Sequence, residues 1–261
     1  MNLIKSEFRK LIYQRSTYGL ILAAVAIAVL ATALSPYAIS QLGNQIVMPL
    51  SSADNIDGIY AKALGSYMFI VIVGVLMMAG EFHHHTAVAT FLSAPKRLNV
   101  LLAKLAVAAI AGAIIDLIAT WVGIASGAIA LGFYPDAAQP HSYIFLNFSA
   151  SAALTGAVLA VVGVGIGALI RNQNLAVTAS LIWLFVVDRI LALVWVDVGK
   201  YLPTGLITAM MNLKIDVTTK TPIAVNTADY LDPIPAAFLL FGYGIVFAAV
   251  SLVFTLRRDI D

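Results

Sequence analysis

The chain alternates between long uncharged apolar tracts and short polar segments, and six of the tracts have the length of a membrane span. About 20 mostly apolar residues are needed to cross the hydrocarbon core as an α-helix. The tracts are continuously apolar, whereas a membrane β-barrel would show short alternating strands. The spans are expected near residues 18–38, 64–80, 104–131, 148–170, 175–196 and 234–256. The pattern therefore predicts an all-α integral membrane protein with six transmembrane helices.

Composition supports a single transmembrane domain over residues 1–261. Hydrophobic residues make up 61% of the chain and charged residues 11%, with a mean hydropathy of +0.96. A soluble domain of this size would carry roughly 25% charged residues. The longest segments expected on the outer side, 39–61 and 197–233, are too short to form a domain of their own. The absence of cysteine excludes disulfides and thiolate metal sites.

The basic residues are distributed unevenly between the two sides of the expected bundle. Six spans place both termini on one side, which would carry ten lysines and arginines against four on the other. Because cytoplasmic loops carry the excess of basic residues, both termini are expected in the cytoplasm of a multi-pass inner (plasma) membrane protein of bacterial origin. The ten are Lys5, Arg9, Lys10, Arg15, Lys96, Arg97, Lys104, Arg171, Arg257 and Arg258, and the four are Lys62, Lys200, Lys214 and Lys220.

Residues 1–16 form an amphipathic stretch ahead of the first span. Its apolar residues fall at helical spacing on one face, and its lysines and arginines lie elsewhere around the helix. We expect an interfacial helix with its apolar face in the acyl boundary and its basic groups near anionic lipid. A second interpretation is a basic flank that only orients the first span. The apolar residues are Leu3, Ile4, Phe8, Leu11 and Ile12.

The segment between the second and third spans carries the most distinctive residues. Glu81 stands where the second span leaves the membrane, and a basic turn follows a short apolar stretch. A short helix flanked in this way would project into the cytoplasm, where a partner's cleft could hold it. The alternative is that Glu81 only caps the span or forms an ion pair at its end. The residues expected to contact the partner are Glu81, Phe82, His83, His84, His85, Thr86, Phe91, Leu92 and Pro95.

At these residues the chain resembles the type-2 ABC transporter permeases, a family of six-span export subunits. Its members commonly carry Gly-Glu-aromatic-Arg-x-Gly-Thr after the second span, then an apolar stretch, a proline, a basic pair and alanine-lysine. The chain departs at His83 and His85, where arginine and glycine are usual. The 201–203 turn and the 257–259 segment are also similar to the family. The matching residues are Gly80, Glu81, Phe82, Thr86, Pro95, Lys96, Arg97, Ala103 and Lys104.

The resemblance implies a function and a set of partners. A permease of this family pairs with a cytoplasmic ATP-binding subunit, which holds ATP and Mg, and two six-span units enclose the pathway as a homodimer or a heterodimer. The segment after Glu81 would be the coupling helix, and residues 1–16 would be the connecting helix beside it. Closure of the ATP-binding subunits would then switch the cavity between inward and outward access, in the direction of export.

The three consecutive histidines, His83 to His85, raise the question of a metal site. Successive residues of a helix point about 100° apart, so these imidazoles cannot converge as an i, i+4 pair would. Glu81 is the one further ligand nearby in sequence. We therefore expect a polar helix face and no metal.

Three charged residues fall inside the expected spans. A charge at the centre of a span costs about 2.5–3.5 kcal/mol on insertion scales, so each should face protein or water and find a partner. We expect Asp116 and Arg189 to form an interhelical ion pair, with Asp188 beside it. The pair would line the translocation path or serve as a buried strut that fixes helix packing.

Other classes of function remain to be weighed against a permease. The chain has no GxxxxGK[ST] phosphate loop, so it is not expected to be an enzyme or to bind a cofactor, and its energy would come from a partner. A gradient-driven secondary transporter often shows paired helix breaks, and no span interior contains proline. An intramembrane hydrolase would need histidines within the spans. A membrane scaffold without transport is the remaining alternative. Membrane lipid is an expected partner and nucleic acid is not.

Overall fold

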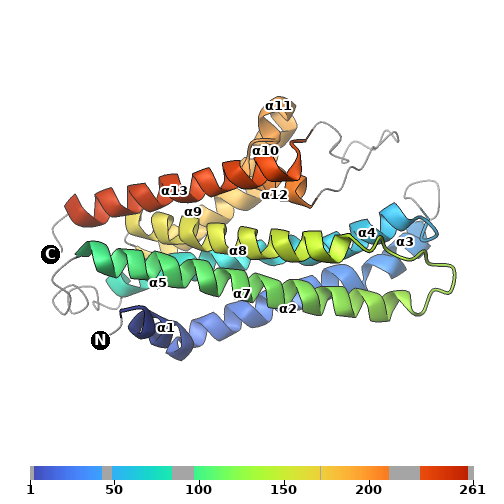
Figure 1. The fold of residues 1–261 in the computed structure, drawn as a ribbon, viewed down its shortest axis with the longest axis horizontal. Helices are drawn as coiled ribbons and strands as arrows, with labels where there is room; N and C mark the ends of the chain where they lie inside the picture. Colours follow the sequence, from blue (N-terminus) through green and yellow to red (C-terminus); the bar gives the residue numbers. More distant parts are fainter. Residues whose placement is uncertain (1–2, 43–48, 84–96, 171, 212–229, 258–261) are drawn as a thin grey trace.

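The computed structural model of the protein describes residues 3–42, 49–83, 97–170, 172–211 and 230–257, and this described part is helical and contains no strand. The elements in chain order are α1 (Leu3–Tyr13), α2 (Arg15–Ala33), α3 (Ser35–Leu42), α4 (Ala53–Ala61), the 3₁₀-helix η1 (Lys62–Ser66), α5 (Tyr67–His83), α7 (Arg97–Leu131), α8 (Ile144–Leu169), α9 (Gln173–Ile182), the π-helix η2 (Trp183–Val187), α10 (Asp188–Val194), α11 (Val196–Gly199), α12 (Pro203–Met210) and α13 (Pro233–Arg257) (Figure 1).

Six helical stretches of the described chain are long and apolar enough to cross a membrane, which confirms the predicted number of spans. They are Arg15–Gln41, Ala53–His83, Leu98–Leu131, Ile144–Leu169, Gln173–Ala192 and Pro233–Val250. The chain thus has the architecture of a multi-pass α-helical membrane protein. The second stretch begins earlier than predicted, because α4 and η1 extend α5 as one continuous helical rod.

The core of the bundle is formed by α5, α7 and α8, which pack against one another along their lengths (Figure 1). The middle of α5 is buried on every side, from Ile70 to Glu81. On the outside, α2 lies along α7, α9 lies beside α5, and α13 lies along α8. The first, fifth and sixth spans are therefore largely exposed to their surroundings, while the second, third and fourth are mostly buried.

Small residues set the close packing of the core helices. A Cβ added to Gly112 or Gly156 would overlap the backbone of the other, so α7 and α8 cross in near backbone contact at this pair. Gly74 of α5 and Gly163 of α8 meet the facing helix in the same way. Lipid tails are as apolar as the side chains of the helices, so the hydrophobic effect does not drive helices together within a membrane. Close van der Waals contacts such as these stabilise their association instead. The structure thus places the glycine residues of the third and fourth spans at helix–helix contacts.

Two spans are interrupted for identifiable reasons. The first bends at Leu34 because Pro36 has no N–H to donate to the Thr32 carbonyl. Next to it, Ser35 Oγ donates to the Ala31 carbonyl at 2.6 Å. The fifth span, predicted as one helix over 175–196, is divided by the π-helix η2 and ends before Trp195. A π-helical turn of this kind is rare and is often found at functional sites.

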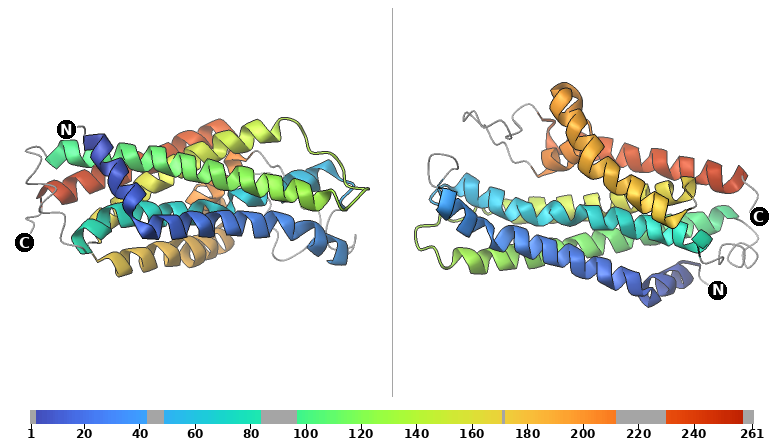
Figure 2. Two further views of the ribbon diagram at one scale, coloured as in Figure 1. Left: turned by 90° about the horizontal axis from the view of Figure 1, so that it is seen from below. Right: turned by 180° about the vertical axis from the view of Figure 1, so that it is seen from behind.

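Both described chain ends lie at the same end of the bundle, together with the last turn of α5 and the first turn of α7 (Figures 1 and 2). Helix α1 is not parallel to the spans but crosses the bundle at this end, where it contacts α7 (Figure 2). We call this the terminal end of the bundle. The loop from 132 to 143 and helix α4 mark the opposite end.

Candidate functional site

Four charged side chains from three helices meet at the terminal end of the bundle. Lys10 Nζ of α1 lies 2.6 Å from Glu7 Oε1 and 2.7 Å from Glu81 Oε1 at the end of α5. Lys104 Nζ of α7 lies 2.6 Å from Glu7 Oε2 and 3.0 Å from the same Glu81 oxygen. Each lysine therefore bridges both carboxylates, and we refer to Glu7, Lys10, Glu81 and Lys104 as the charge cluster.

The charge cluster is almost completely withdrawn from solvent. Glu7 is 4% exposed, Glu81 8% and Lys104 2%, whereas the Lys10 side chain is 41% exposed. Lys104 makes a third hydrogen bond, which it donates to the Met77 carbonyl at 3.0 Å. Buried charges are tolerated when they are paired and hydrogen-bonded in this way. Two acids and two bases balance each other, so the cluster carries no net charge.

The sequence of α1 brings the cluster and an apolar contact to the same side of the helix. Glu7, Lys10 and Leu11 follow one another at helical spacing. Leu11 is buried in the core cluster that contains Met77 and Leu105, and Phe8 packs against its edge. Helix α1 is thus held to α5 and α7 by ion pairs and by apolar packing together.

The surroundings of Glu7 and Lys10 shift both pKa values toward the charged forms. Burial alone would raise the pKa of Glu7, but the ammonium groups of Lys104 and Lys10 outweigh it and lower the pKa below its ordinary value of 4.5. Burial alone would lower the pKa of Lys10, but its hydrogen bonds to Glu7 and Glu81 outweigh it and raise the pKa. Glu7 and Lys10 are therefore both ionised at neutral pH.

The lowered pKa of Glu7 predicts an acid dependence of stability. Because the pKa is lower in the folded protein, the contribution of Glu7 is complete above the ordinary value of 4.5 and is lost as the pH falls through the folded pKa. Thermal unfolding in detergent should show that Glu7→Gln is less stable than the wild type at neutral pH, and that the difference narrows as the pH falls below 4.5. A difference that stays constant over this range would contradict an ionic role for Glu7.

A cavity of about 550 Å³ opens beside the charge cluster. Its walls include Gln14, Gly80 and Gln173, so it lies between α1, α5 and the start of α9. All four members of the charge cluster line this cavity, so the ion pairs form part of its wall.

The residues predicted to contact a partner are only partly within the described chain. Glu81, Phe82 and His83 form the last turn of α5. Glu81 does form ion pairs at the end of its span, as one of the two interpretations expects. His84, His85, Thr86, Phe91, Leu92 and Pro95, and with them the predicted short helix, lie outside the described residues.

The predicted ion pair between Asp116 and Arg189 is not formed. Asp116 Oδ1 accepts a hydrogen bond of 2.8 Å from the Ser66 hydroxyl of η1, and its Oδ2 has no partner among the described residues. Asp116 sits beside the Gly112–Gly156 crossing, where its own Cβ faces α8. Arg189, on α10, interacts instead with Tyr67, the residue that follows Ser66. Which charged side chains can pair depends on which helices are neighbours in the bundle, and hydropathy does not specify this.

Asp188 and Arg189 instead join a second polar group. The buried Asp188 accepts a hydrogen bond from the Thr204 hydroxyl at the start of α12. Arg189 interacts with the hydroxyl of Tyr67 at the start of α5, and it lies within electrostatic reach of Tyr230. This group joins the broken fifth span to α5 and α12. Tyr67 and Thr204 do not stand out in the sequence, since both residue types are common near helix ends.

A third group lies at the opposite end of the bundle. The buried Asp57 of α4 accepts a hydrogen bond from the backbone N–H of His141 at 3.1 Å, and its second oxygen lies 2.7 Å from His141 Nδ1. Asp54 completes a set of three potential metal ligands whose atoms lie within 4.8 Å of one another. In the structure, the contact fastens α4 to the loop between α7 and α8.

Glu7 is the member of the charge cluster that sequence reasoning missed. It is the acidic residue within the strongly basic first sixteen residues, three positions before Lys10 and on the side of Leu11. An acid placed toward the apolar face of a basic helix is the signal that could have identified it.

Comparisons with models of known protein families and with curated proteins give no match for this chain.

Proposed function

We propose that the chain is the membrane-spanning permease subunit of an ATP-driven transporter of the ABC type. The observation that carries the proposal is the charge cluster, which ties α1 to both helices that flank the segment 84–96. A partner that moves this segment would move the ends of α5 and α7, and with them α1. The type-2 ABC permease signature within residues 80–104 supports the same function.

The packing of α5 explains how such a movement would reach the membrane interior. Helix α5 is buried on all sides and packs along α8 in near backbone contact at Gly74 and Gly163. Closely packed interiors deform little, so a displacement at one end of α5 is passed on to its neighbours. The charge cluster makes α1 part of the same rigid unit.

The absence of a phosphate-binding loop and the exposed apolar side chains of α1 indicate the expected partners. It has no phosphate-binding loop, so ATP and Mg would be bound by a separate subunit at the terminal end, on the cytoplasmic side. Exposed Ile4, Ile12 and Tyr13 of α1 would rest in the acyl boundary of the inner leaflet. Two such permeases, identical or different, would enclose the pathway, and export is the direction typical of the family that the chain resembles.

Co-purification with an ATP-binding subunit tests the proposal. We expect the tagged chain, expressed in its native host, to recover an ABC-type ATPase in detergent and to change that subunit's rate of ATP hydrolysis. Phe91→Asp should reduce the recovered ATPase by at least about tenfold, equivalent to about 1.4 kcal/mol of binding. Phe133→Asp is the matched control, because Phe133 is exposed at the opposite end of the bundle. Recovery that is equal for both variants would refute docking at the predicted segment.

A gradient-driven secondary transporter is the second candidate, and one structural observation favours it. The second span contains a 3₁₀ segment and the fifth contains a π segment, although neither contains an internal proline. Each of these departures from α-helix lies beside a buried aspartate, Asp116 in one case and Asp188 in the other. Irregular helix segments near intramembrane charges are typical of ion-coupled carriers. Transport by the chain alone in sealed vesicles with an ion gradient and no ATP would favour this candidate over the first.

A further inference from the structure

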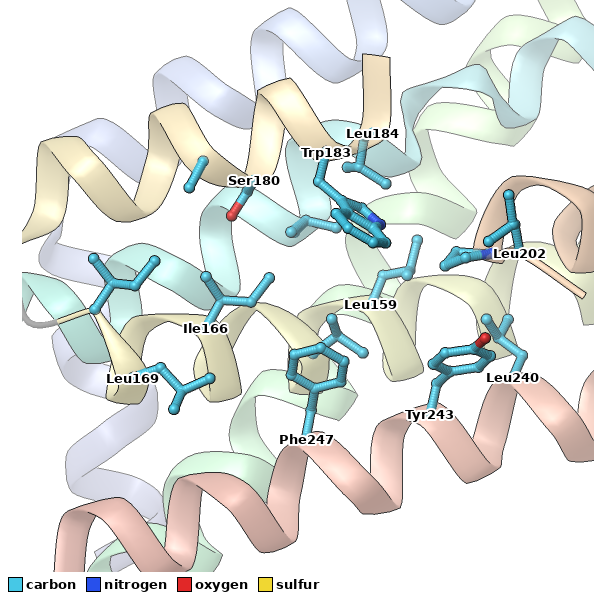
Figure 3. A pocket seen from close by; sticks show the side chains of 15 residues that line it. Leu159, Ile166, Leu169, Ser180, Trp183, Leu184, Leu202, Leu240, Tyr243 and Phe247 are labelled. Carbon is cyan, nitrogen blue, oxygen red and sulfur yellow. The ribbon is translucent and has the colours of Figure 1, made fainter. Parts of the chain in front are cut away.

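A cavity of about 340 Å³ lies between the fifth and sixth spans, with α8 as its floor. One wall is formed by α9 and η2, the other by α13, and the first residues of α12 close one end (Figure 3). In Figure 3 the side chain of Trp183 points into the space from one side, and those of Phe247 and Tyr243 point into it from the other. All the walls belong to one chain, so the cavity does not depend on a partner.

The lining of this cavity offers almost nothing to water. Most lining side chains are aliphatic or aromatic. The Ser180 hydroxyl donates its hydrogen bond to the Ala176 carbonyl at 2.8 Å, and the Tyr243 hydroxyl donates to the Tyr201 carbonyl at 3.3 Å. A water molecule needs two to four polar partners to occupy a cavity, and apolar cavities of comparable size bind apolar ligands instead.

The position of the cavity determines which apolar ligands can reach it. Both walls are membrane spans that are mostly exposed, since 22% of the fifth and 17% of the sixth span are buried. In a bilayer the medium around these two helices is hydrocarbon. The π-helix η2 supplies Trp183 and Leu184 to the wall, and a π-helical turn is frequently a functional feature.

We propose that this cavity binds one hydrocarbon chain of an amphiphile, either the acyl chain of a membrane lipid or a single-chain amphiphile. The indole nitrogen of Trp183, which lies toward the Leu202 end in Figure 3, supplies a donor for the polar part of that molecule. The inference rests on the chain spanning a membrane and not on its association with an ATPase. It therefore stands or falls separately from the proposed function.

The size of the cavity distinguishes a hydrocarbon chain from a helix of a second copy. A helix with its side chains is about 10–12 Å across. The cavity has walls from α8, α9, η2 and α13, so a helix of a second copy would lie over it and not within it. A single acyl chain is one methylene wide and can lie between α9 and α13 without separating them.

Photolabelling tests the proposal with a defined probe. The protein is reconstituted in vesicles of phosphatidylethanolamine and phosphatidylglycerol that contain a trace of phospholipid with a diazirine on the acyl chain. After irradiation, mass spectrometry locates the labelled residues. We expect saturable labelling at Ile166 and Phe247 inside the cavity, and labelling that does not saturate at Ile114, which is exposed on the surface of α7.

A pair of matched substitutions identifies the cavity as the site. Val162→Trp places an indole ring in the cavity and should reduce labelling at Ile166 and Phe247 by about tenfold. The ring takes the space of the hydrocarbon chain, and the packed helices around it cannot move apart without cost. Val122→Trp adds the same group to an exposed position on α7 and should leave the labelling unchanged. If Val162→Trp does not fold, Leu169→Trp at the Ile170 end of the cavity takes its place.

The outcomes separate the possible occupants. Competition by unlabelled phospholipid identifies a bilayer lipid, and competition by fatty acid or lysophospholipid alone identifies a single-chain amphiphile; either result supports a hydrocarbon-chain site. Labelling inside the cavity that does not saturate, or that persists in Val162→Trp, would overturn it. The chain has no native cysteine, so Phe247→Cys introduces a single thiol. Disulfide-linked dimers of this variant would show that a second copy covers the cavity, and they would also overturn the hydrocarbon-chain site.

Discussion

Lys104→Met is expected to lower the free energy of unfolding by about 3–5 kcal/mol, the cost of breaking a buried ion pair by removal of one partner. Lys104 is 2% exposed and bridges Glu7 and Glu81. Methionine retains the apolar stem but supplies none of the three hydrogen bonds. The two buried carboxylates would lose the buried ammonium group that they share and keep Lys10, whose side chain is partly exposed.

Thermal and denaturant unfolding in detergent micelles measures this effect. Lys200→Met is the matched control, because Lys200 lies 3.8 Å from the fully exposed Asp197 and surface pairs of this kind contribute about 0–1 kcal/mol. We expect Lys104→Met to unfold at a clearly lower denaturant concentration while Lys200→Met stays close to the wild type. Equal shifts in the two variants would show that the charge cluster does not stabilise the bundle.

Gly156→Ala is expected to cost about 3 kcal/mol, the upper part of the range for overpacking in a well-packed interior. The new methyl group would overlap the backbone of Gly112 and approach the Cβ of Asp116 to 2.8 Å. Neither is the end of a flexible side chain, so α7 and α8 would have to separate. Because both helices belong to the core, the separation would also loosen the contacts of α5.

Gly242→Ala is the control for this substitution. Gly242 also lies in a membrane-spanning helix, but a Cβ there has nothing within 4 Å. Alanine is favoured over glycine in a helix by about 1 kcal/mol, so this variant should be as stable as the wild type or slightly more stable. The two variants are compared by unfolding in the same detergent. A loss of stability in Gly242→Ala as large as in Gly156→Ala would contradict the role of the helix crossing.

The number of spans could be predicted from the sequence because it depends only on the length and polarity of each tract. The start of the second span could not, since Asp57 and Lys62 are charged and lie ahead of the uncharged tract from which the span is predicted. In the structure each of these charges has a local partner. Asp57 contacts His141, and Lys62 donates to Ser35 Oγ at 2.8 Å. Helix α4 can therefore continue into η1 and α5 with its charges satisfied.

The candidate site could be predicted in part. Glu81 is identifiable from its place at the end of a span, because a charge there must be hydrated or paired. Its partners Glu7 and Lys104 depend on which helices meet, and hydropathy carries no such information. For the same reason Asp116 and Arg189 were wrongly paired: Asp116 faces Ser66, and Arg189 faces Tyr67. The role of residues 84–96 stays a prediction.

The unequal burial of the spans has a consequence for biogenesis. The second, third and fourth spans, 72%, 56% and 61% buried, form the central three-helix unit, and all of its residues precede residue 170. These helices can find one another in the membrane while the ribosome is still synthesising the fifth and sixth spans. The last two then attach to a finished surface, α9 on α5 and α13 on α8. Translation order and packing order coincide, so the three core helices can pack together before the last two spans are made.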